Sequence, residues 1–290
     1  MPDPGMADFE AIRAFEHAGW EQAADTYEAS FATATRQFIP ALLDAAGVGA
    51  AKADGVGVDG AGVAAGMRVL DVACGPGFVT AAAATRGATA VGLDFSAAML
   101  RVARARHGGV VFDQGDAEAL PYADRSFDAV VSNFGIHHVP RPVMALREAY
   151  RVLRPGSALA FTIWAAPDEN AAWKLVFDAV RREGEMAASR APAPGGGFRT
   201  PDDCRAALGA AGFGHIGAQR LTGVWRHADG LALLMALRSG TARMAALINA
   251  QAPAALPAIA ADIDAHAASF RDGTGLAIPL TAFVATGRRD

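Results

Sequence analysis

The chain has 290 residues, of which 52% are hydrophobic and 19% charged, and its net charge is −4 at pH 7. This length fits one large domain or one domain with a cap, and the composition excludes wholesale disorder. The acidic balance argues against a nucleic-acid surface, and two cysteines, Cys74 and Cys204, are too few for a disulfide framework. The acidic start lacks a secretion signal, and no apolar run reaches the roughly 18 residues of a membrane span. We therefore expect a cytoplasmic protein without a membrane partner.

The first segment, residues 1–48, is expected to form a helical lid. Apolar residues recur at alternating steps of four and three from Trp20 to Phe38, which places them on one face of an amphipathic helix. Pro40 should kink or restart that helix. The small residues of 45–66 are typical of a linker or a loosely ordered surface segment.

The next part of the chain alternates short apolar runs with helical runs. Strands are predicted at 67–73, 89–95, 110–116, 126–134 and 157–165, and two closing strands at 215–221 and 280–287. This alternation indicates βαβ units around a buried parallel sheet. Between the two closing strands, residues 228–270 are largely helical and apolar, which indicates a cap over a pocket.

A glycine-containing loop follows the first predicted strand, in the sequence VLDVACGPGFVT. A phosphate-binding P-loop would end in Gly-Lys-Ser/Thr, and Gly77 is followed by Phe78, so we reject that interpretation. A dinucleotide fingerprint would place a third glycine where Thr80 stands, so that match is partial. The third interpretation fits best: Asp71, the two glycines and Asp94 at the end of the second strand resemble the class I S-adenosylmethionine-dependent methyltransferases.

Four further segments carry the same resemblance. Residues 92–100 resemble the ribose-binding motif, and 114–132 are similar to the adenine-binding motif and fourth strand of the ubiquinone/menaquinone-type branch. Residues 133–142 and 147–162 resemble that branch's loop after strand four and its helix, turn and fifth strand. The resemblance is strong over 67–162, returns at 280–287, and is nearly absent over the cap.

The resemblance implies S-adenosylmethionine as cofactor and an α/β, Rossmann-like, doubly wound, mostly parallel seven-stranded sheet. The domain boundaries would be 1–48 for the lid, 66–224 for the core, 225–275 for a helical substrate cap inserted before the last strand, and 276–290 for that strand. The cofactor carries an ammonium, a sulfonium and ribose hydroxyls, which favour carboxylates at the strand ends. The expected cofactor-binding residues are Tyr27, Arg36, Asp71, Ala73, Gly75, Gly77, Asp94, Phe95, Met99, Gly115, Asp116, Ala117, Asn133 and Phe134.

Individual roles follow for some of these residues. Asp94 would accept from both ribose hydroxyls, and Asp116 from the adenine amino group. Tyr27 and Arg36 would reach the carboxylate of the cofactor. For any one acid taken singly, a solvated strand end or a helix cap is the alternative interpretation.

The loop after strand four carries His137 and His138, the candidate catalytic bases, because histidine titrates near neutrality. Adjacent residues of an extended loop point to opposite sides, so only one should face the pocket; the alternative is that both simply stabilise the loop. No metal site is expected, because the histidines lack a nearby acid at ligand spacing. The candidate substrate-binding residues are Trp164, Phe198, Trp225 and Met235, with ordinary core packing as the alternative for each.

The leading function is transfer of a methyl group from S-adenosylmethionine to a small, hydrophobic or aromatic acceptor, with O- or C-methylation favoured. The alternatives are an NAD(P)-dependent oxidoreductase and a non-catalytic S-adenosylmethionine-binding protein. The expected partner is the small-molecule acceptor, with no nucleic acid, and a homodimer is left open.

Overall fold

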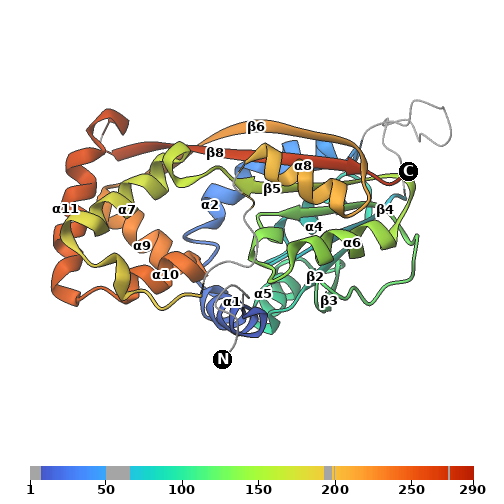
Figure 1. The fold of residues 1–290 in the computed structure, drawn as a ribbon, viewed down its shortest axis with the longest axis horizontal. Helices are drawn as coiled ribbons and strands as arrows, with labels where there is room; N and C mark the ends of the chain where they lie inside the picture. Colours follow the sequence, from blue (N-terminus) through green and yellow to red (C-terminus); the bar gives the residue numbers. More distant parts are fainter. Residues whose placement is uncertain (1–7, 50–65, 193–197, 199, 274) are drawn as a thin grey trace.

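The computed structural model describes residues 8–49, 66–192, 198, 200–273 and 275–290 (Figure 1). Most of the stretch interpreted as a linker, residues 50–65, lies outside the described part. Within the described part, no single helix has the length and apolar character to span a membrane. Two consecutive helices are together long and apolar enough, but the chain bends by 118° between them.

One mixed sheet runs through the molecule, and its strands lie in the order β3-β2-β1-β4-β5-β8-β6. The seven strands are β1 (Arg68–Val72), β2 (Thr89–Asp94), β3 (Val111–Gln114), β4 (Phe127–Asn133), β5 (Leu153–Trp164), β6 (Gly214–His227) and β8 (Gly275–Arg288). The first five are parallel, and β8 runs antiparallel to both β5 and β6. A two-residue strand, β7 (Arg271–Asp272), pairs with β8. The predicted doubly wound, mostly parallel sheet is confirmed, with β7 as an addition.

Helices cover both faces of the sheet and bury its apolar residues. On one face, α6 (Pro142–Val152) and α8 (Pro201–Ala210) pack against β1, β4 and β5 in one hydrophobic core. On the other face, α3 (Ile39–Ala45) and α4 (Phe78–Thr85) pack against the same strands in a second core. α5 (Ala97–Arg106) packs beside β3 through Leu100, Ala103 and Phe112. Strands covered on both faces explain the continuous apolar runs in the sequence.

The N-terminal segment is not one helix, so that prediction is wrong. α1 (Phe9–Ala23) ends before residues 24–31, which form turns, and α2 (Ala32–Thr35), a 3-10 turn and α3 follow. The hydroxyl of Thr26 donates to the backbone oxygen of Ser239 at 2.6 Å, which ties these turns to the helix that ends at Gly240. The turns let Phe31 and Phe38, 4% and 2% exposed, enter the core separately. Pro40 lies in the first turn of α3, where a new helix begins, as predicted.

A second helical lobe stands beside the sheet (Figure 1). Its helices are α7 (Ala171–Glu183), α9 (Gly230–Gly240), α10 (Ala242–Asn249) and α11 (Leu256–His266). They share a hydrophobic core with the outer halves of β6 and β8. Both closing strands are therefore longer than predicted, because Trp225, Leu276 and Ile278 are buried against these helices. Trp225 lies in β6, and the inserted helices begin at Gly230.

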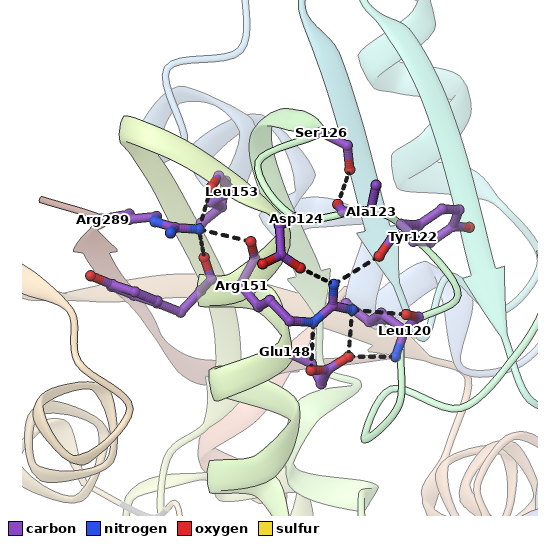
Figure 2. A network of polar contacts seen from close by, with 10 residues as sticks. Leu120, Tyr122, Ala123, Asp124, Ser126, Glu148, Arg151, Leu153 and Arg289 are labelled. Atoms are coloured by element: carbon purple, nitrogen blue, oxygen red, sulfur yellow. Dashed lines mark hydrogen bonds and ion pairs between the residues drawn. The ribbon is translucent and has the colours of Figure 1, made fainter.

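A polar network fixes the long loop between β3 and β4, which carries part of the site (Figure 2). The guanidinium of Arg151, on α6, donates to the backbone oxygens of Leu120 and Tyr122 and pairs with Asp124 and Glu148. Glu148 also accepts from the backbone N–H of Leu120 at 2.8 Å. The loop is thereby held to α6 through its backbone, which fixes where its first residues lie.

Candidate active site

One pocket lies at the carboxyl ends of β1, β2 and β4, the edge where open α/β sheets bind ligands. Every predicted cofactor-binding residue except Gly77 lines this pocket, and so does His138. The N-terminal segment adds residues that the motifs do not contain, namely Arg13, Trp20, Thr35 and Ile39. The structure thus brings together residues that are spread over more than 120 positions of the sequence.

The loop after β1 turns sharply by means of unusual backbone angles. Ala73, Gly75 and Gly77 have φ of 56°, 52° and 80°, in the left-handed region that favours glycine. A Cβ on Gly77 would lie 2.6 Å from the Phe112 ring, so that glycine is required by packing. A Cβ on Gly75 would meet only the Met99 sulfur, at 4.0 Å, and would otherwise project into the pocket. Gly75 is therefore the glycine that leaves room for a ligand.

Asp94, at the end of β2, is bound by the glycine loop. Its Oδ2 accepts from the backbone N–H of Gly75 at 2.8 Å, and its Oδ1 accepts from that of Ser96 at 2.9 Å. The side chain is 5% exposed, so Asp94 is not a solvated strand end. Burial raises its pKa to about 6, although the backbone N–H groups act in the opposite direction. Each oxygen retains a lone pair that could accept from a hydroxyl.

Asp71, near the end of β1, is the most buried acid of the pocket. Its Oδ2 accepts from the Thr80 hydroxyl at 2.6 Å, whereas Oδ1 has no hydrogen-bond partner among the described residues. Burial raises its pKa to about 7. An unpartnered carboxylate oxygen in a pocket is suited to a cationic ligand group. Thr80, which stands where a dinucleotide fingerprint has its third glycine, is used to hold this acid.

Asp116 follows β3 and is joined to α1. Its Oδ1 accepts from the backbone N–H of Glu118 at 2.9 Å, and its Oδ2 pairs with Arg13 of α1. Glu118 is 7% exposed, accepts from Arg13, and pairs with Arg141 before α6 at 2.6 Å. Neither Arg13 nor Glu118 was singled out from the sequence. They tie the adenine-motif loop to the N-terminal helix.

Asn133 and Phe134 end β4 and form the floor beside the histidines. The Thr162 hydroxyl donates to Asn133 Oδ1 at 2.7 Å and accepts from the Phe134 N–H at 2.9 Å. The Asn133 amide donates to the backbone oxygen of Thr35 at 3.1 Å. Phe134 has a positive φ of 57°, which directs the chain sharply into the turn that holds both histidines. Strands β4 and β5 and the N-terminal segment are thus locked together here.

His138, but not His137, lines the pocket, in agreement with the expectation that only one would face it. Glu16 of α1 lies 3.0 Å from His138 Nδ1, and the Trp20 ring packs edge-on against the imidazole with centroids 4.9 Å apart. Burial lowers the pKa of His137 well below its usual value, as do the charges of His138 and Arg243. His137 is therefore a neutral ring behind the pocket wall.

Tyr27 and Arg36 border the pocket from the N-terminal segment. The Tyr27 hydroxyl is 3.0 Å from the Thr35 hydroxyl, and burial raises its pKa to about 12. Arg36 is exposed and stacks over the Phe78 ring at 4.6 Å. Both can act as hydrogen-bond donors to an anionic group.

Comparison with known proteins identifies the core. Residues 70–161 match the family described as methyltransferase domain. Demethylmenaquinone methyltransferase from Renibacterium salmoninarum is 46% identical over 110 residues, covering 38% of this chain and 46% of that protein. A ubiquinone/menaquinone biosynthesis C-methyltransferase from Rhodopseudomonas palustris is 44% identical over 121 residues, covering 38% and 48%. Over residues 70–161 this chain is therefore similar to a methyltransferase domain. The chain spans about half the length of the curated relatives it matches.

Solved structures extend the similarity in fold beyond this methyltransferase domain. A SAM-dependent methyltransferase of Thermotoga maritima has a TM-score of 0.52 at 16% identity, covering 95% of this chain and 100% of that one. A protein from an antibiotic biosynthesis pathway of Anabaena variabilis has a TM-score of 0.56 at 15% identity, covering 91% and 98%. At these identities the similarity shows the fold alone.

The residues of the methyltransferase pocket fit S-adenosylmethionine. The free Oδ1 of Asp71 is suited to an ammonium, Asp94 retains acceptor capacity for hydroxyls, and the space in front of Gly75 is open. Among the described residues, no lysine lines the pocket, which suits a ligand without phosphate.

The predicted substrate-binding residues do not line this pocket. Trp225 is 1% exposed and its indole N–H donates to Thr33, while Phe198 packs on Phe161. Trp164 stacks on Phe134 at 3.9 Å, behind the pocket wall. Met235 lies on α9 and is 38% exposed. Three of the four thus take part in packing, the alternative considered for them. Trp164 and Trp225 belong to the core of the helical lobe, and Phe198 packs against the core between the sheet and helices α6 and α8.

Proposed function

We propose that this protein transfers a methyl group from S-adenosylmethionine to the oxygen or carbon of a small acceptor that loses a proton in the reaction. The observation that carries the proposal is a single pocket that combines three acidic strand ends, an open glycine loop and one histidine. The two relatives reported above carry the names of quinone-pathway methyltransferases, and a malonyl-[acyl-carrier protein] O-methyltransferase from Enterobacter lignolyticus is 40% identical over 112 residues. Here the acceptor is left at the level of class.

The acids would hold the methyl donor by charge and hydrogen bonds. Asp94 would bind the ribose, Asp116 the adenine amino group, and Asp71 the ammonium. The donor supplies a methyl carbon activated by its sulfonium, so the main task of the protein is to hold the acceptor in line with that carbon. The loop after β4, with Asn133, Phe134 and His138, borders the space where the acceptor would enter.

His138 would act as the general base. It lines the pocket, and the Glu16 carboxylate lies 3.0 Å from its Nδ1, which leaves Nε2 for the acceptor proton. Such a group contributes roughly 10²–10⁴-fold to a rate. The walls near His138 are mostly apolar, including Trp20, Phe134, Val139 and Pro140. They favour a hydrophobic or aromatic acceptor such as a phenol or quinol.

We also propose that α1 is the lid, narrower than the expected residues 1–48. Its side chains reach the loop after β3, the start of α5 and the loop after β4. From residue 31 onward the segment is part of the fixed core, since Phe31, Phe38, Leu42 and Leu43 are buried. No described residue of 225–275 lines the pocket, so a substrate cap there is not supported. A cytoplasmic location and a homodimer stay predictions from the sequence.

The test is transfer of a labelled methyl group from S-adenosylmethionine into a panel of a 1,4-naphthohydroquinone, a catechol and a malonyl thioester, followed by a mixed metabolite extract. We expect label in at least one acceptor, and kcat lowered about 100-fold or more in His138→Ala. Binding of the donor without transfer to any of these would favour the non-catalytic binder.

A further inference from the structure

We propose that Glu16 is a positioning residue that holds His138 in the tautomer whose Nε2 can accept a proton. Because Glu16 lies on α1, this tautomer depends on the docking of α1. This inference rests on the proposed function. It concerns a residue that lies outside the matched methyltransferase domain and outside every motif of the sequence.

Glu16 is a buried carboxylate surrounded by donors. Its side chain is 1% exposed. Oε2 lies 3.0 Å from His138 Nδ1 and accepts from the Trp20 indole N–H at 3.1 Å, and Oε1 lies 2.6 Å from Arg243 Nε. A buried acid without such partners would be strongly destabilising. Burial raises the pKa of Glu16, but the contacts with His138 and Arg243 outweigh it and hold the pKa below its usual value. Glu16 is therefore ionised and can only accept.

An ionised acceptor at Nδ1 selects one tautomer of the neutral imidazole. The carboxylate lies 3.0 Å from Nδ1 as an ion-pair contact without an aligned hydrogen bond, and its negative charge favours the proton on Nδ1 and the lone pair on Nε2. The Trp20 ring, at 79° to the imidazole, limits rotation of the ring from the side. The His137 ring also packs against the imidazole, with ring centroids 4.2 Å apart. This arrangement leaves Nε2 as the nitrogen that can receive a proton in the pocket that His138 lines.

The group is assembled from three separate parts of the chain. Glu16 and Trp20 come from α1, His138 from the turn after β4, and Arg243 from α10. Figure 1 shows α1 at the junction between the sheet and the helical lobe. Arg243 also donates to the backbone oxygen of Pro192 at 2.7 Å and lies over the Phe15 ring of α1. The base is therefore complete only while α1 is docked against both lobes.

The proton balance of the reaction fits this role. The acceptor oxygen or carbon forms its bond to the methyl carbon as the methyl–sulfur bond breaks, and that electron pair goes to sulfur. The acceptor proton passes to His138 Nε2. The imidazolium formed in that step lies against the Glu16 carboxylate, which stabilises it as the buried acid of a catalytic triad does.

The experiment compares Glu16→Gln with two other changes on the same N-terminal segment. Nitrogen-15 NMR of the free protein reads the tautomer of His138, and steady-state kinetics with whichever panel acceptor reacts gives kcat. Calorimetry with S-adenosylhomocysteine gives donor-site affinity separately. We expect the Nδ1–H tautomer in the wild type, its loss in Glu16→Gln, and kcat lower by roughly 10²-fold with donor affinity changed by less than about 3-fold.

The matched variants separate positioning from simple closure. Glu21→Gln loosens α1 from the start of α5, where Glu21 accepts from the Ser96 hydroxyl and the Ala98 N–H, without touching His138. Asp25→Asn removes an exposed ion pair with Arg101. We expect Glu21→Gln to weaken donor binding and keep the tautomer, and Asp25→Asn to change neither. If Glu16→Gln fails to fold, Glu16→Asp takes its place, because it keeps the charge but has a shorter side chain. It should show a smaller loss of the Nδ1–H tautomer and of kcat.

Three results would overturn the proposal. They are an Nε2–H tautomer in the wild type, an unchanged tautomer in Glu16→Gln, and a loss of kcat in Glu16→Gln no larger than in Glu21→Gln. The tautomer is measured without acceptor or donor. A protein that binds donor but methylates nothing would therefore contradict the proposed function, while the NMR result would still decide whether Glu16 positions His138.

Discussion

Asp71 and Asp94 are buried acids whose pKa values are raised by the fold, Asp71 to about 7 and Asp94 to about 6. A carboxylate that is harder to ionise when folded costs stability at neutral pH, because the unfolded chain ionises it more easily. Such groups are found where a ligand offsets the cost. In this pocket the ligand proposed is a cation with ribose hydroxyls.

The first prediction is that donor binding releases protons near pH 7. In the free protein Asp71 is partly protonated there, because burial raises its pKa to about 7. An ammonium beside Oδ1 would favour the charged form, so the proton leaves when the ligand binds. Affinity should therefore rise between about pH 6 and pH 8. Calorimetry with S-adenosylhomocysteine in buffers of different ionisation enthalpy measures the release directly.

Asp71→Asn is the control for this prediction. It should bind more weakly and release fewer protons. The stability cost of Asp71 is absent at low pH and sets in as pH rises from its unfolded value of about 4 to its folded value of about 7. The variant should therefore melt higher than the wild type at pH 8 but not at pH 4. Equal buffer dependence in both proteins would contradict the role given to Asp71.

The second prediction concerns Asp94→Ala, which should lower both affinity and stability. The variant loses the acceptor for two ribose hydroxyls, and it also leaves the backbone N–H groups of Gly75 and Ser96 without a partner. Unsatisfied buried groups cost about 1–3 kcal/mol each. The dissociation constant of S-adenosylmethionine should rise more than about 10-fold, and the melting temperature should fall. An unchanged dissociation constant would remove the ribose assignment.

The third prediction separates the two glycines of the loop. Gly75→Val should abolish donor binding with a smaller loss of stability, because its side chain would project into the pocket. Gly77→Val is the matched change at a similar positive φ, and its Cβ would meet the Phe112 ring at 2.6 Å. It should lower the melting temperature more. Calorimetry and thermal melts of both variants would show it, and normal affinity in Gly75→Val would mean that the loop does not bind the donor.

At the residue scale, sequence reasoning found the pocket residues that belong to motifs and missed those that do not. Asp71, Gly75, Asp94 and Asp116 were found because each lies at or near the end of a predicted strand, at a spacing typical of the family. Glu16 has no motif. Its signal is its position on the buried face of α1, one helical turn after Ile12 and one before Trp20. An acid on an apolar helix face requires a partner, and that partner lies more than 100 residues away.

At the element scale, the two halves of the N-terminal segment behave differently. α1 contacts the pocket mainly through polar side chains, such as Arg13, Glu16 and Glu21. Residues 31–48 instead bury aromatic and aliphatic side chains in two hydrophobic cores. Periodicity alone could not separate the two, because an apolar face looks alike on a mobile lid and on a fixed core element. Deleting the N-terminal residues up to and including Phe38 would therefore remove core residues as well as the lid.

The fourth prediction follows from this difference. Hydrogen exchange of α1 should be fast in the free protein and slower with S-adenosylhomocysteine bound, because polar contacts hold it and bound ligand adds to them. Residues 31–48 and helices α9 to α11 should change little. Equal protection of α1 in both states would make it a fixed element, and the lid proposal would fail.

At the scale of the whole molecule, β6 and β8 join two hydrophobic cores into one protein. Their inner halves complete the sheet beside β5, and their outer halves are buried in the helical lobe. The sheet could be predicted because strand spacing and motifs repeat along 67–162. The lobe could be predicted only as helical and apolar, since nothing in its sequence says which surface it covers. Its helices bury Leu233, Leu237 and Ile263 among themselves.

The central claim is that the pocket beneath α1 is an S-adenosylmethionine site. Titration calorimetry of the wild-type protein with S-adenosylmethionine and, separately, with NAD tests it most directly. The account predicts saturable binding of S-adenosylmethionine at one site per chain, lost in Gly75→Val, and no measurable binding of NAD. Binding of NAD in preference to S-adenosylmethionine, or binding of S-adenosylmethionine that survives Gly75→Val unchanged, would contradict it.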